Sequence, residues 1–238
     1  MEILDPIPID LNAESVGEKL RVSETGNWEQ FQTLFAVATN SIAAKAAYGI
    51  RYVDERREDA VVIDAVLFRS RVLRKQLEDV ERVFPYVVTI GPALEERFNG
   101  LDDLLAKYYL DAIGNIALVE ARSYLQDELC SKFALKRVSF MSPGSLEDWP
   151  IEQQKPLFSF FEGREHTIGV TLTDSCIMVP RKSVSGIYFP TETTFYNCQL
   201  CPRPKCVGRK AAYSEKLAEK YGINRKQEAY HGGMGESV

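Results

Sequence analysis

The stretch Ile168-Gly-Val-Thr-Leu-Thr-Asp-Ser-Cys-Ile-Met-Val-Pro180, followed closely by Ser183-Val-Ser-Gly-Ile-Tyr-Phe189, predicts short strands joined by tight turns. A glycine inside a strand, here Gly186, allows a ligand or another backbone to approach closely. Tyr188 offers an aromatic face and a hydroxyl, which suit an adenine or a sugar. The alternative is a β-hairpin whose tyrosine and phenylalanine are core residues. The stretch therefore predicts sheet structure and leaves two interpretations of Tyr188 open.

The remainder of the chain predicts a mixture of helices and strands. A long apolar stripe at helical spacing, with Asp102 and Asp103 at its start, indicates the longest helix. The helices are expected at residues 28–50, about 69–82, 101–131, 151–161 and 214–221. The strands are expected at residues 60–68, 83–90, 135–140, 168–173, 176–179 and 183–189. Because helices and strands do not alternate strictly, the predicted fold class is α+β.

Length and composition are those of an ordinary globular protein. The 238 residues are 45% hydrophobic and 26% charged, enough for one domain, or one domain with an appendage. The net charge of −5 argues against nucleic acid as the main partner. No run approaches the roughly 18 apolar residues that span a bilayer. The N-terminus carries acid where a secretory signal carries base. We therefore expect a cytoplasmic protein that binds neither nucleic acid nor membrane.

Three cysteines, Cys198, Cys201 and Cys206, form a C-x2-C-x4-C run in a basic segment. Thiolates at this spacing suit an iron–sulfur cluster or zinc, and neighbouring cations favour the thiolate form. Cys176 or a residue of a partner protein is the candidate fourth ligand. Cys130, near the end of the long helix, is expected to lie in the core. The alternative for the run is three ordinary thiols in a solvated loop.

Other candidate chemical groups are few. His166 and His231 are the only histidines, and both are expected outside any ligand set, in a solvated turn and in a loose tail. Glu147 and Asp148 beside Trp149 form either an acid pair at a pocket mouth or a cap of the next helix. The sequence has no P-loop and no G-x-S-x-G, H-E-x-x-H or G-x-G-x-x-G motif. A histidine-based hydrolase is therefore not predicted.

The string Leu172-Thr-Asp-Ser, followed by Met178, Pro180 and Ser183-Val-Ser-Gly-Ile-Tyr-Phe189, resembles the activation domain of cobalamin-dependent methionine synthase. That domain has Leu-Thr-Glu-Ser leading into Ser-Val-Ser-Gly-x-Tyr-Phe, and an Ala-Pro-Gly turn where this chain has Ser142-Pro-Gly. The specific match covers about residues 105–190, and the chain resembles stand-alone relatives rather than a fragment of the synthase. The resemblance implies an α+β domain over residues 1–190 with a mixed or antiparallel twisted sheet and packed helices. A cysteine-rich segment, a short helix and a flexible tail are expected over residues 191–238.

The resemblance implies reductive activation of a corrinoid protein or a corrinoid-dependent methyltransferase. In that family the domain binds S-adenosylmethionine beside cobalamin. An external electron converts inactive cobalt(II) to cobalt(I), which the methyl group of S-adenosylmethionine then traps. By the same resemblance, Tyr188 corresponds to a tyrosine that contacts the ligand, and Pro143 and Gly144 offer backbone groups to it. The predicted cofactor-binding set is Ser142, Pro143, Gly144, Ser185, Gly186 and Tyr188.

One position departs from the family pattern. The family has an arginine three residues before the proline of the turn, where it can grip the carboxylate of the ligand, and this chain has Phe140 there. Arg137 is close in sequence, but a shift of three residues along a strand changes the face. Arg181 and Lys182 are further candidates for this carboxylate-binding role.

The cysteine run adds an element that the synthase domain lacks. A cluster there predicts an electron relay to cobalt in place of a flavoprotein donor, in a corrinoid reductive activase or methyltransferase component. The alternative is a non-enzymatic docking or assembly factor for a corrinoid protein, with zinc as a structural element. An electron-transfer protein that reuses the fold is a third reading. The sequence leaves open whether the protein is an enzyme.

Overall fold

The structure, a computed structural model, describes residues 1–203, 205–206 and 209–223. Its main sheet contains eight strands: β1 (Glu2–Leu4), β2 (Lys45–Tyr48), β3 (Arg51–Arg56), β4 (Ala60–Ile63), β5 (Val66–Arg69), β6 (Arg82–Thr89), β7 (Val138–Met141) and β10 (Ser183–Pro190). Every pairing in this sheet is antiparallel. A separate hairpin is formed by β8 (Thr171–Leu172) and β9 (Met178–Val179).

The helices are α1 (Ala13–Lys19), α2 (Val22–Thr25), α3 (Trp28–Ser41), α4 (Arg71–Gln76), α5 (Ala93–Asn99), α6 (Leu104–Lys132), α7 (Gln154–Ser159) and α8 (Glu215–Lys220). Three short 3-10 helices complete the described elements: η1 (Ile151–Gln153), η2 (Arg164–Ile168) and η3 (Asn197–Gln199). This mixture of helices with one antiparallel sheet confirms the predicted α+β class.

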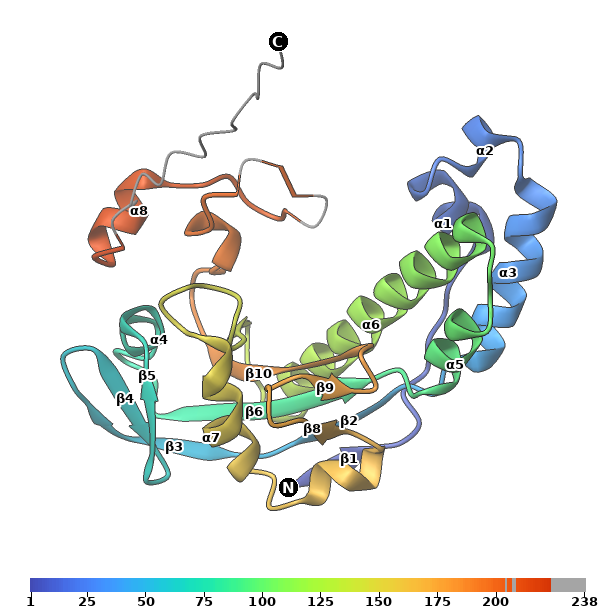
Figure 1. Cartoon of the computed structure of the whole chain (residues 1–238). Helices are drawn as coiled ribbons and strands as arrows, with labels where there is room; N and C mark the ends of the chain where they lie inside the picture. Colours follow the sequence, from blue (N-terminus) through green and yellow to red (C-terminus); the bar gives the residue numbers. More distant parts are fainter. Residues whose placement is uncertain (204, 207–208, 224–238) are drawn as a thin grey trace, which may run out of the picture.

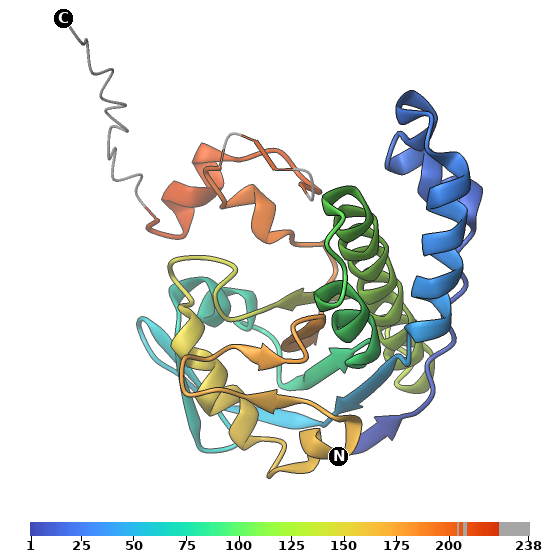
Figure 2. The ribbon, with the colours of Figure 1, turned by 45° about the vertical axis from the view of Figure 1, so that its right-hand side comes forward.

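Strand β6 is the centre of the sheet. It pairs with β10 along one edge and with β2 and then β3 along the other, and β7 continues the sheet beyond β10. Its side chains alternate between two buried layers. Phe84 and Tyr86 belong to a core with α3 and α6, whereas Val83 and Val87 belong to a core with α4 and α7. The sheet is thus covered on both faces, with α3 and α6 side by side on one of them (Figures 1 and 2).

Helix α6 has nearly the predicted bounds, but its buried face differs from the predicted one. Asp103 is the N-cap, and its carboxylate accepts hydrogen bonds from the backbone N–H groups of Leu105 and Ala106. The apolar stripe expected from the sequence, Leu105, Tyr109, Ala112, Ile116, Val119 and Leu125, was only partly right, because Val119 is exposed and only Tyr109 and Leu125 of the set are fully buried. The buried face is instead formed by Ala106, Tyr109, Ile113, Ala117, Ala121, Leu125 and Leu129. These positions are three or four residues apart, so they share one face of the helix. In the described part of the chain no helix is both long and apolar enough to cross a membrane.

Three sequence predictions were wrong in extent. The helix expected over residues 28–50 ends at Ser41, and the alanine-rich segment after it forms β2, which pairs with β1 and β6. The single strand expected over residues 60–68 is a hairpin, because Asp64 and Ala65 adopt positive φ angles of 42° and 63° between β4 and β5. The charged helix expected over about residues 69–82 is confined to α4.

Asp148 caps α4 from a distant part of the chain. Its carboxylate, whose side chain is 7% exposed, accepts hydrogen bonds from Ser70 Oγ at 2.6 Å and the Val72 N–H at 2.9 Å, and pairs with Arg71 at 3.3 Å. The prediction that the Asp-Trp-Pro sequence caps the following helix was wrong, because η1 has Pro150 at its N-cap and no side-chain cap.

We expect Asp148→Ala to lower the free energy of unfolding by about 2–3 kcal/mol, because a buried hydroxyl, an N–H and a guanidinium lose their acceptor. Urea unfolding measures this, and Glu147→Ala is the matched control, since Glu147 is exposed. Equal loss of stability in both variants would contradict the capping role.

Candidate functional site

The Ser-Val-Ser-Gly-Ile-Tyr-Phe string forms most of β10, in the middle of the sheet. Gly186 lies opposite Tyr86 of β6, and Tyr188 lies opposite Phe140 of β7. Residues paired across neighbouring strands share a face of the sheet. Gly186, Tyr188, Tyr86 and Phe140 therefore all lie on the α6 face, close to where β7 enters the turn at residues 142–145.

Tyr188 is a core residue in this structure. It has no exposed surface, its ring lies 4.5 Å from that of Tyr86, and the edge of Phe140 meets it at 5.7 Å. Its hydroxyl donates a hydrogen bond to the carbonyl of Arg122 at 3.0 Å. Burial raises the pKa of Tyr188 well above its ordinary value, so the hydroxyl remains a donor. The structure thus corresponds to the core interpretation, and a side chain this deeply buried offers no ring face to a ligand from solvent.

Gly186 permits the close approach of another strand's backbone. A Cβ atom at this position would lie 2.3 Å from the carbonyl oxygen of Met141, 2.8 Å from Ser142 Oγ and 3.0 Å from Tyr86 Oη. Contacts that short are not tolerated, so only glycine allows β7 to end against β10 here. The close contact that the sequence predicts at Gly186 is therefore made by the Met141 backbone and by the hydroxyl groups of Ser142 and Tyr86.

The turn after β7 uses most of its own polar groups. The Gly144 N–H donates to the carbonyl of Trp149 at 2.7 Å, and the Ser145 N–H donates to the carbonyl of Ser142 at 3.2 Å. Pro143 is buried, while Gly144 is exposed and has a φ of 80°. The Gly144 N–H is therefore engaged within the turn, and the role of the Pro143 and Gly144 backbone groups toward a ligand stays a prediction.

The predicted binding residues do not share one face. Ser185 points away from α6, and its hydroxyl, itself buried, donates to Oε1 of the buried Gln154 of α7 at 3.2 Å. Ser142 and Gly144 are the members of the set that have surface to offer. The set as a whole stays a prediction, and Pro143, Ser185, Gly186 and Tyr188 are buried.

Sequence reasoning missed Arg122, which lies over Phe140, the residue that stands where the family pattern has an arginine. The guanidinium of Arg122, in α6, stacks 4.1 Å from the ring centre of Phe140. Among the described residues it makes no ion pair with a carboxylate. The apolar pattern of α6 predicted only packing, because Arg122 follows the buried Ala121 at the margin of the stripe.

The hydroxyl of Tyr86 is buried in the same place. No hydrogen bond of standard geometry reaches it within the described chain, although the side chains of Ser142 and Arg122 lie close to it. Burial raises the pKa of Tyr86, and the neighbouring Arg122 and Ser142 oppose that shift. The hydroxyls of Tyr86 and Ser142 therefore meet above Gly186, next to a guanidinium that forms no ion pair within the described residues.

Arg181 and Lys182, the further candidates for binding the carboxylate of the ligand, form ion pairs with other residues of the chain. Arg181 pairs with Glu95 at 2.7 Å, and Lys182 pairs with Asp111 at 2.6 Å. The cavity beside them measures about 20 Å³, which holds no more than about one water molecule. Arg137 donates to the backbone carbonyl of Glu192 at 3.3 Å.

The cysteines are divided between two regions. Cys198 belongs to η3 and accepts a hydrogen bond at Sγ from the Lys210 N–H at 3.4 Å, while Cys206 is exposed. Cys176 is buried in the turn of the β8–β9 hairpin, with a φ of 63°. Over residues 1–203, 205–206 and 209–223, no three or more His, Cys, Asp or Glu side chains are placed to hold a metal ion. The described arrangement therefore does not assemble the predicted four-cysteine site.

The remaining candidates from the sequence have ordinary surroundings. Cys130 is half-buried against the α6 core, and burial raises the pKa of its thiol. His166 lies in η2 with its side chain 60% exposed, next to Glu165 at 3.7 Å. His231 lies outside the described residues.

The cysteine segment is attached to the turn that follows β7. Nδ2 of Asn197, at the start of η3, donates to Ser145 Oγ at 2.6 Å. Arg209 donates to the carbonyls of Cys198 at 3.1 Å and Cys201 at 3.3 Å, which holds the loop closed. Burial, followed by the nearby charge of Arg122, lowers the pKa of Lys210. The segment therefore brings a second cation to the Arg122 region.

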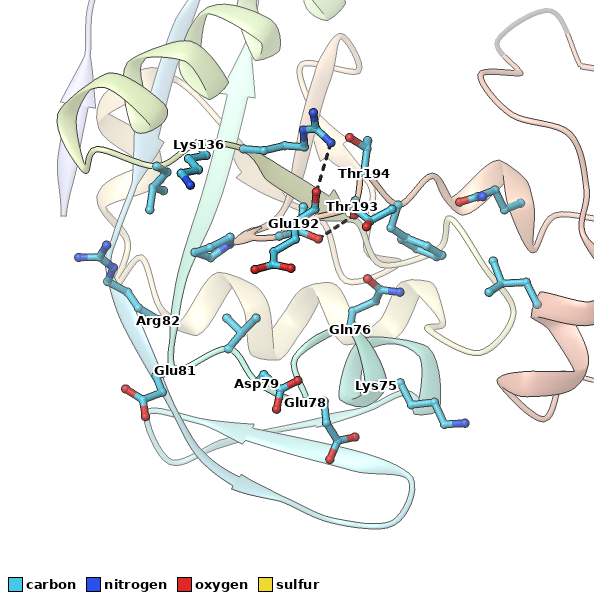
Figure 3. A pocket seen from close by; sticks show the side chains of 18 of the residues that line it. Lys75, Gln76, Glu78, Asp79, Glu81, Arg82, Lys136, Glu192, Thr193 and Thr194 are labelled. Carbon is cyan, nitrogen blue, oxygen red and sulfur yellow. Dashed lines mark hydrogen bonds between the residues drawn. The ribbon is translucent and has the colours of Figure 1, made fainter.

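A much larger cavity than the one beside Arg181 and Lys182 lies elsewhere on the molecule. It measures about 1220 Å³ and is bounded by residues 75–82, 135–137, 190–195 and α8. Its labelled walls carry both signs of charge, with Glu78, Asp79 and Glu81 near Arg82 and Lys75 (Figure 3). None of the predicted ligand-binding residues lines it. The mixed charge gives no preference for an ionic ligand, so the Arg122 region is the better candidate site.

Comparison with known proteins agrees with the resemblance found in the sequence. Residues 144–206 match the family model described as "Vitamin B12 dependent methionine synthase, activation domain". The chain is similar to that activation domain. A solved structure, "Crystal Structure of the MetH Reactivation Domain bound to AdoHcy", has the same fold with a TM-score of 0.53, covering 82% of this chain and 80% of that chain at 14% identity. The predicted relationship and fold class are thus confirmed. A search of curated proteins found no match.

The segment that matches the activation domain differs in extent from the one expected. It begins at Gly144 in the turn, includes all of β10 and continues through Cys206. The cysteine run was expected to lie outside the similarity, which was placed at about residues 105–190. Arg122 and Tyr86 lie before the matched segment and join the site only through the fold.

Proposed function

We propose that this protein reactivates a corrinoid protein, or a corrinoid-dependent methyltransferase, whose cobalt has been oxidised to cobalt(II). The observation that carries the proposal is the match of residues 144–206 to the methionine synthase activation domain. The matched segment contains the Ser-Val-Ser-Gly-Ile-Tyr-Phe strand and begins in the adjoining turn. The shared fold with a reactivation domain crystallised with AdoHcy supports it.

The proposed reaction has two steps. One electron from a donor protein reduces cobalt(II) of the corrinoid substrate to cobalt(I). The methyl group of S-adenosylmethionine then passes to cobalt(I), and S-adenosylhomocysteine leaves. This chain would supply positioning, because the sulfonium methyl group must lie in line with the cobalt. A cytoplasmic location, where thiols stay reduced, is part of the proposal.

The ligand would lie at the end of β7, where the chain enters the turn at residues 142–145; this edge is called the rim. Ser142 and the exposed Gly144 are on that rim, and Arg122 and Phe140 border it from α6 and β7. The buried residues of the predicted set, including Gly186 and Tyr188, would fix the shape of the floor beneath the ligand.

Isothermal titration calorimetry with S-adenosylmethionine and S-adenosylhomocysteine tests the proposal directly. We expect saturable binding of both to one site on the wild-type chain, followed by methyl transfer to cobalamin in the presence of a strong one-electron reductant. Wild-type protein that gives no heat with either compound at millimolar concentration would remove S-adenosylmethionine from the proposal.

The cysteine run is proposed as a metal site, either an iron–sulfur electron relay or zinc. Support comes from the N–H of Lys210 on Cys198 Sγ and from the Arg209 hydrogen bonds that close the loop. No step above depends on it, because the described residues do not assemble a metal site. The bond between Asn197 and Ser145 favours the alternative of a non-enzymatic docking or assembly factor in which structural zinc secures this segment.

Metal analysis of protein purified without oxygen separates these readings. We expect iron and sulfide in near-equal amounts, with a visible spectrum that a strong reductant bleaches, and loss of both in Cys201→Ser. Cys130→Ser is the matched control, because Cys130 lies in α6 away from the run. Stoichiometric zinc would support the docking alternative, and colourless, metal-free protein would contradict both forms of the site.

A further inference from the structure

We propose that Arg122 of α6 is the anion-binding residue of this chain and takes the carboxylate of a small, amino-acid-bearing ligand. The inference rests on the proposed function for the identity of that ligand. It assigns the carboxylate-binding role to a residue of helix α6 whose guanidinium lies over Phe140 of β7.

The first support is the balance of charge around Arg122. Its guanidinium lies over Phe140 and, within the described residues, pairs with no carboxylate. The amino group of Lys210 lies near Arg122 and Cys198, whose charges act on its pKa in opposite directions, and in the part of the chain described Lys210 pairs with no carboxylate. Two neighbouring cations without a counter-charge attract an anion.

The second support is the pair of hydroxyl groups beside the guanidinium. Tyr86 Oη is fully buried, and among the described residues it makes no hydrogen bond of standard geometry, although buried hydroxyls normally make one. Ser142 Oγ lies next to it, since both oxygens are within 3.0 Å of the point where a Cβ on Gly186 would stand. The site therefore combines a cation with two hydroxyls, one of which forms no well-aligned hydrogen bond within the described residues.

The geometry favours a planar carboxylate. A guanidinium binds two oxygens side by side through parallel N–H groups. The ring of Phe140, 4.1 Å from the guanidinium carbon, restricts its plane, as stacked arginines commonly show. Phe140 therefore acts as a positioning residue for Arg122.

A pair of ligands isolates the carboxylate contact. S-adenosylhomocysteine carries it, whereas 5′-methylthioadenosine keeps the adenosine and the sulfur but has no carboxylate. We expect Arg122→Met to weaken S-adenosylhomocysteine binding about 30- to 100-fold, as for loss of a charge-assisted bidentate contact. Its affinity for 5′-methylthioadenosine should change less than about threefold, because that ligand does not reach the guanidinium. Arg122→Lys should recover part of the loss.

Arg137→Met is the control, because Arg137 is engaged with the carbonyl of Glu192 and is not part of the proposed site. Binding of S-adenosylhomocysteine by Arg122→Met at wild-type affinity would overturn the inference and leave the proposed function intact. Circular dichroism checks the fold of each variant, and Arg122→Lys provides the comparison if Arg122→Met does not fold.

If the wild-type chain binds neither nucleoside, S-adenosylmethionine is removed from the proposed function and acetate decides the inference. The Arg122 Nε–H resonance, assigned by its absence from the Arg122→Lys spectrum, should then shift with added acetate and not with added chloride. A resonance that acetate leaves unmoved would overturn the anion site itself.

Discussion

Replacing Tyr188 with alanine is expected to lower the free energy of unfolding by about 4 kcal/mol, within the range for removal of a buried aromatic ring. The ring is fully buried between Tyr86 and Phe140, so its loss leaves a cavity in the centre of the α6 layer. Because total stabilities are commonly about 5–15 kcal/mol, this variant should be partly unfolded at moderate temperature. Urea unfolding followed by circular dichroism measures the change.

Tyr188→Phe separates packing from the hydroxyl. It keeps the ring and removes only the hydrogen bond to the carbonyl of Arg122, so we expect a loss of about 1 kcal/mol. The two variants together test the assignment of Tyr188 to the core. A Tyr188→Ala protein with wild-type stability that has lost only S-adenosylmethionine binding would instead restore the role of direct ligand contact.

The sequence could predict elements whose patterns are local. Helix α6 has a capping aspartate followed by an apolar stripe at helical spacing, and β6 has a run of β-branched and aromatic residues, so both were recognised. The turn after β7 followed from adjacent proline and glycine. In each case the residues that determine the element are contiguous or one helical turn apart.

Elements determined by distant pairing were mispredicted. The alanine-rich segment 43–47 has a high helix propensity, but its last residues form a strand because they pair with β1 and β6. The hairpin of β4 and β5 depends on Asp64 and Ala65 in left-handed conformations, and the Ala65 N–H donates to Asp54 Oδ2 at 2.7 Å. Neither residue is a glycine, so the turn carried no usual sequence signal.

The candidate site likewise combines residues that the sequence could identify with residues that only the fold brings together. Gly186 and the turn were found from the motif, whereas Arg122 was not, because its relation to Phe140 exists only when α6 lies across the sheet. Cys176 was grouped with the cysteine run by residue type alone. The fold buries it in the β8–β9 turn, where its side chain has little exposed surface.

Gly186→Ala is the second change with a large expected effect, a loss of about 3 kcal/mol at the upper end of the range for overpacking. The added Cβ would lie 2.3 Å from the Met141 carbonyl oxygen, and a backbone atom cannot avoid it by rotating about a side-chain bond. Strand β7 must therefore move away from β10 and carry Ser142 with it. Urea unfolding measures the loss, and Gly49→Ala is the matched control, since its nearest atoms are side-chain atoms of Arg51 at 3.6 Å.

The same variant connects stability with the proposed site. Ser142 Oγ and Tyr86 Oη lie within 3.0 Å of the new methyl group, so their displacement should weaken S-adenosylhomocysteine binding even under conditions where the variant remains folded. We expect Gly49→Ala to bind as the wild type does. Wild-type stability in Gly186→Ala would mean that β7 does not end against β10 as described. A destabilised variant with unchanged affinity would mean that the ligand lies away from the hydroxyls above Gly186.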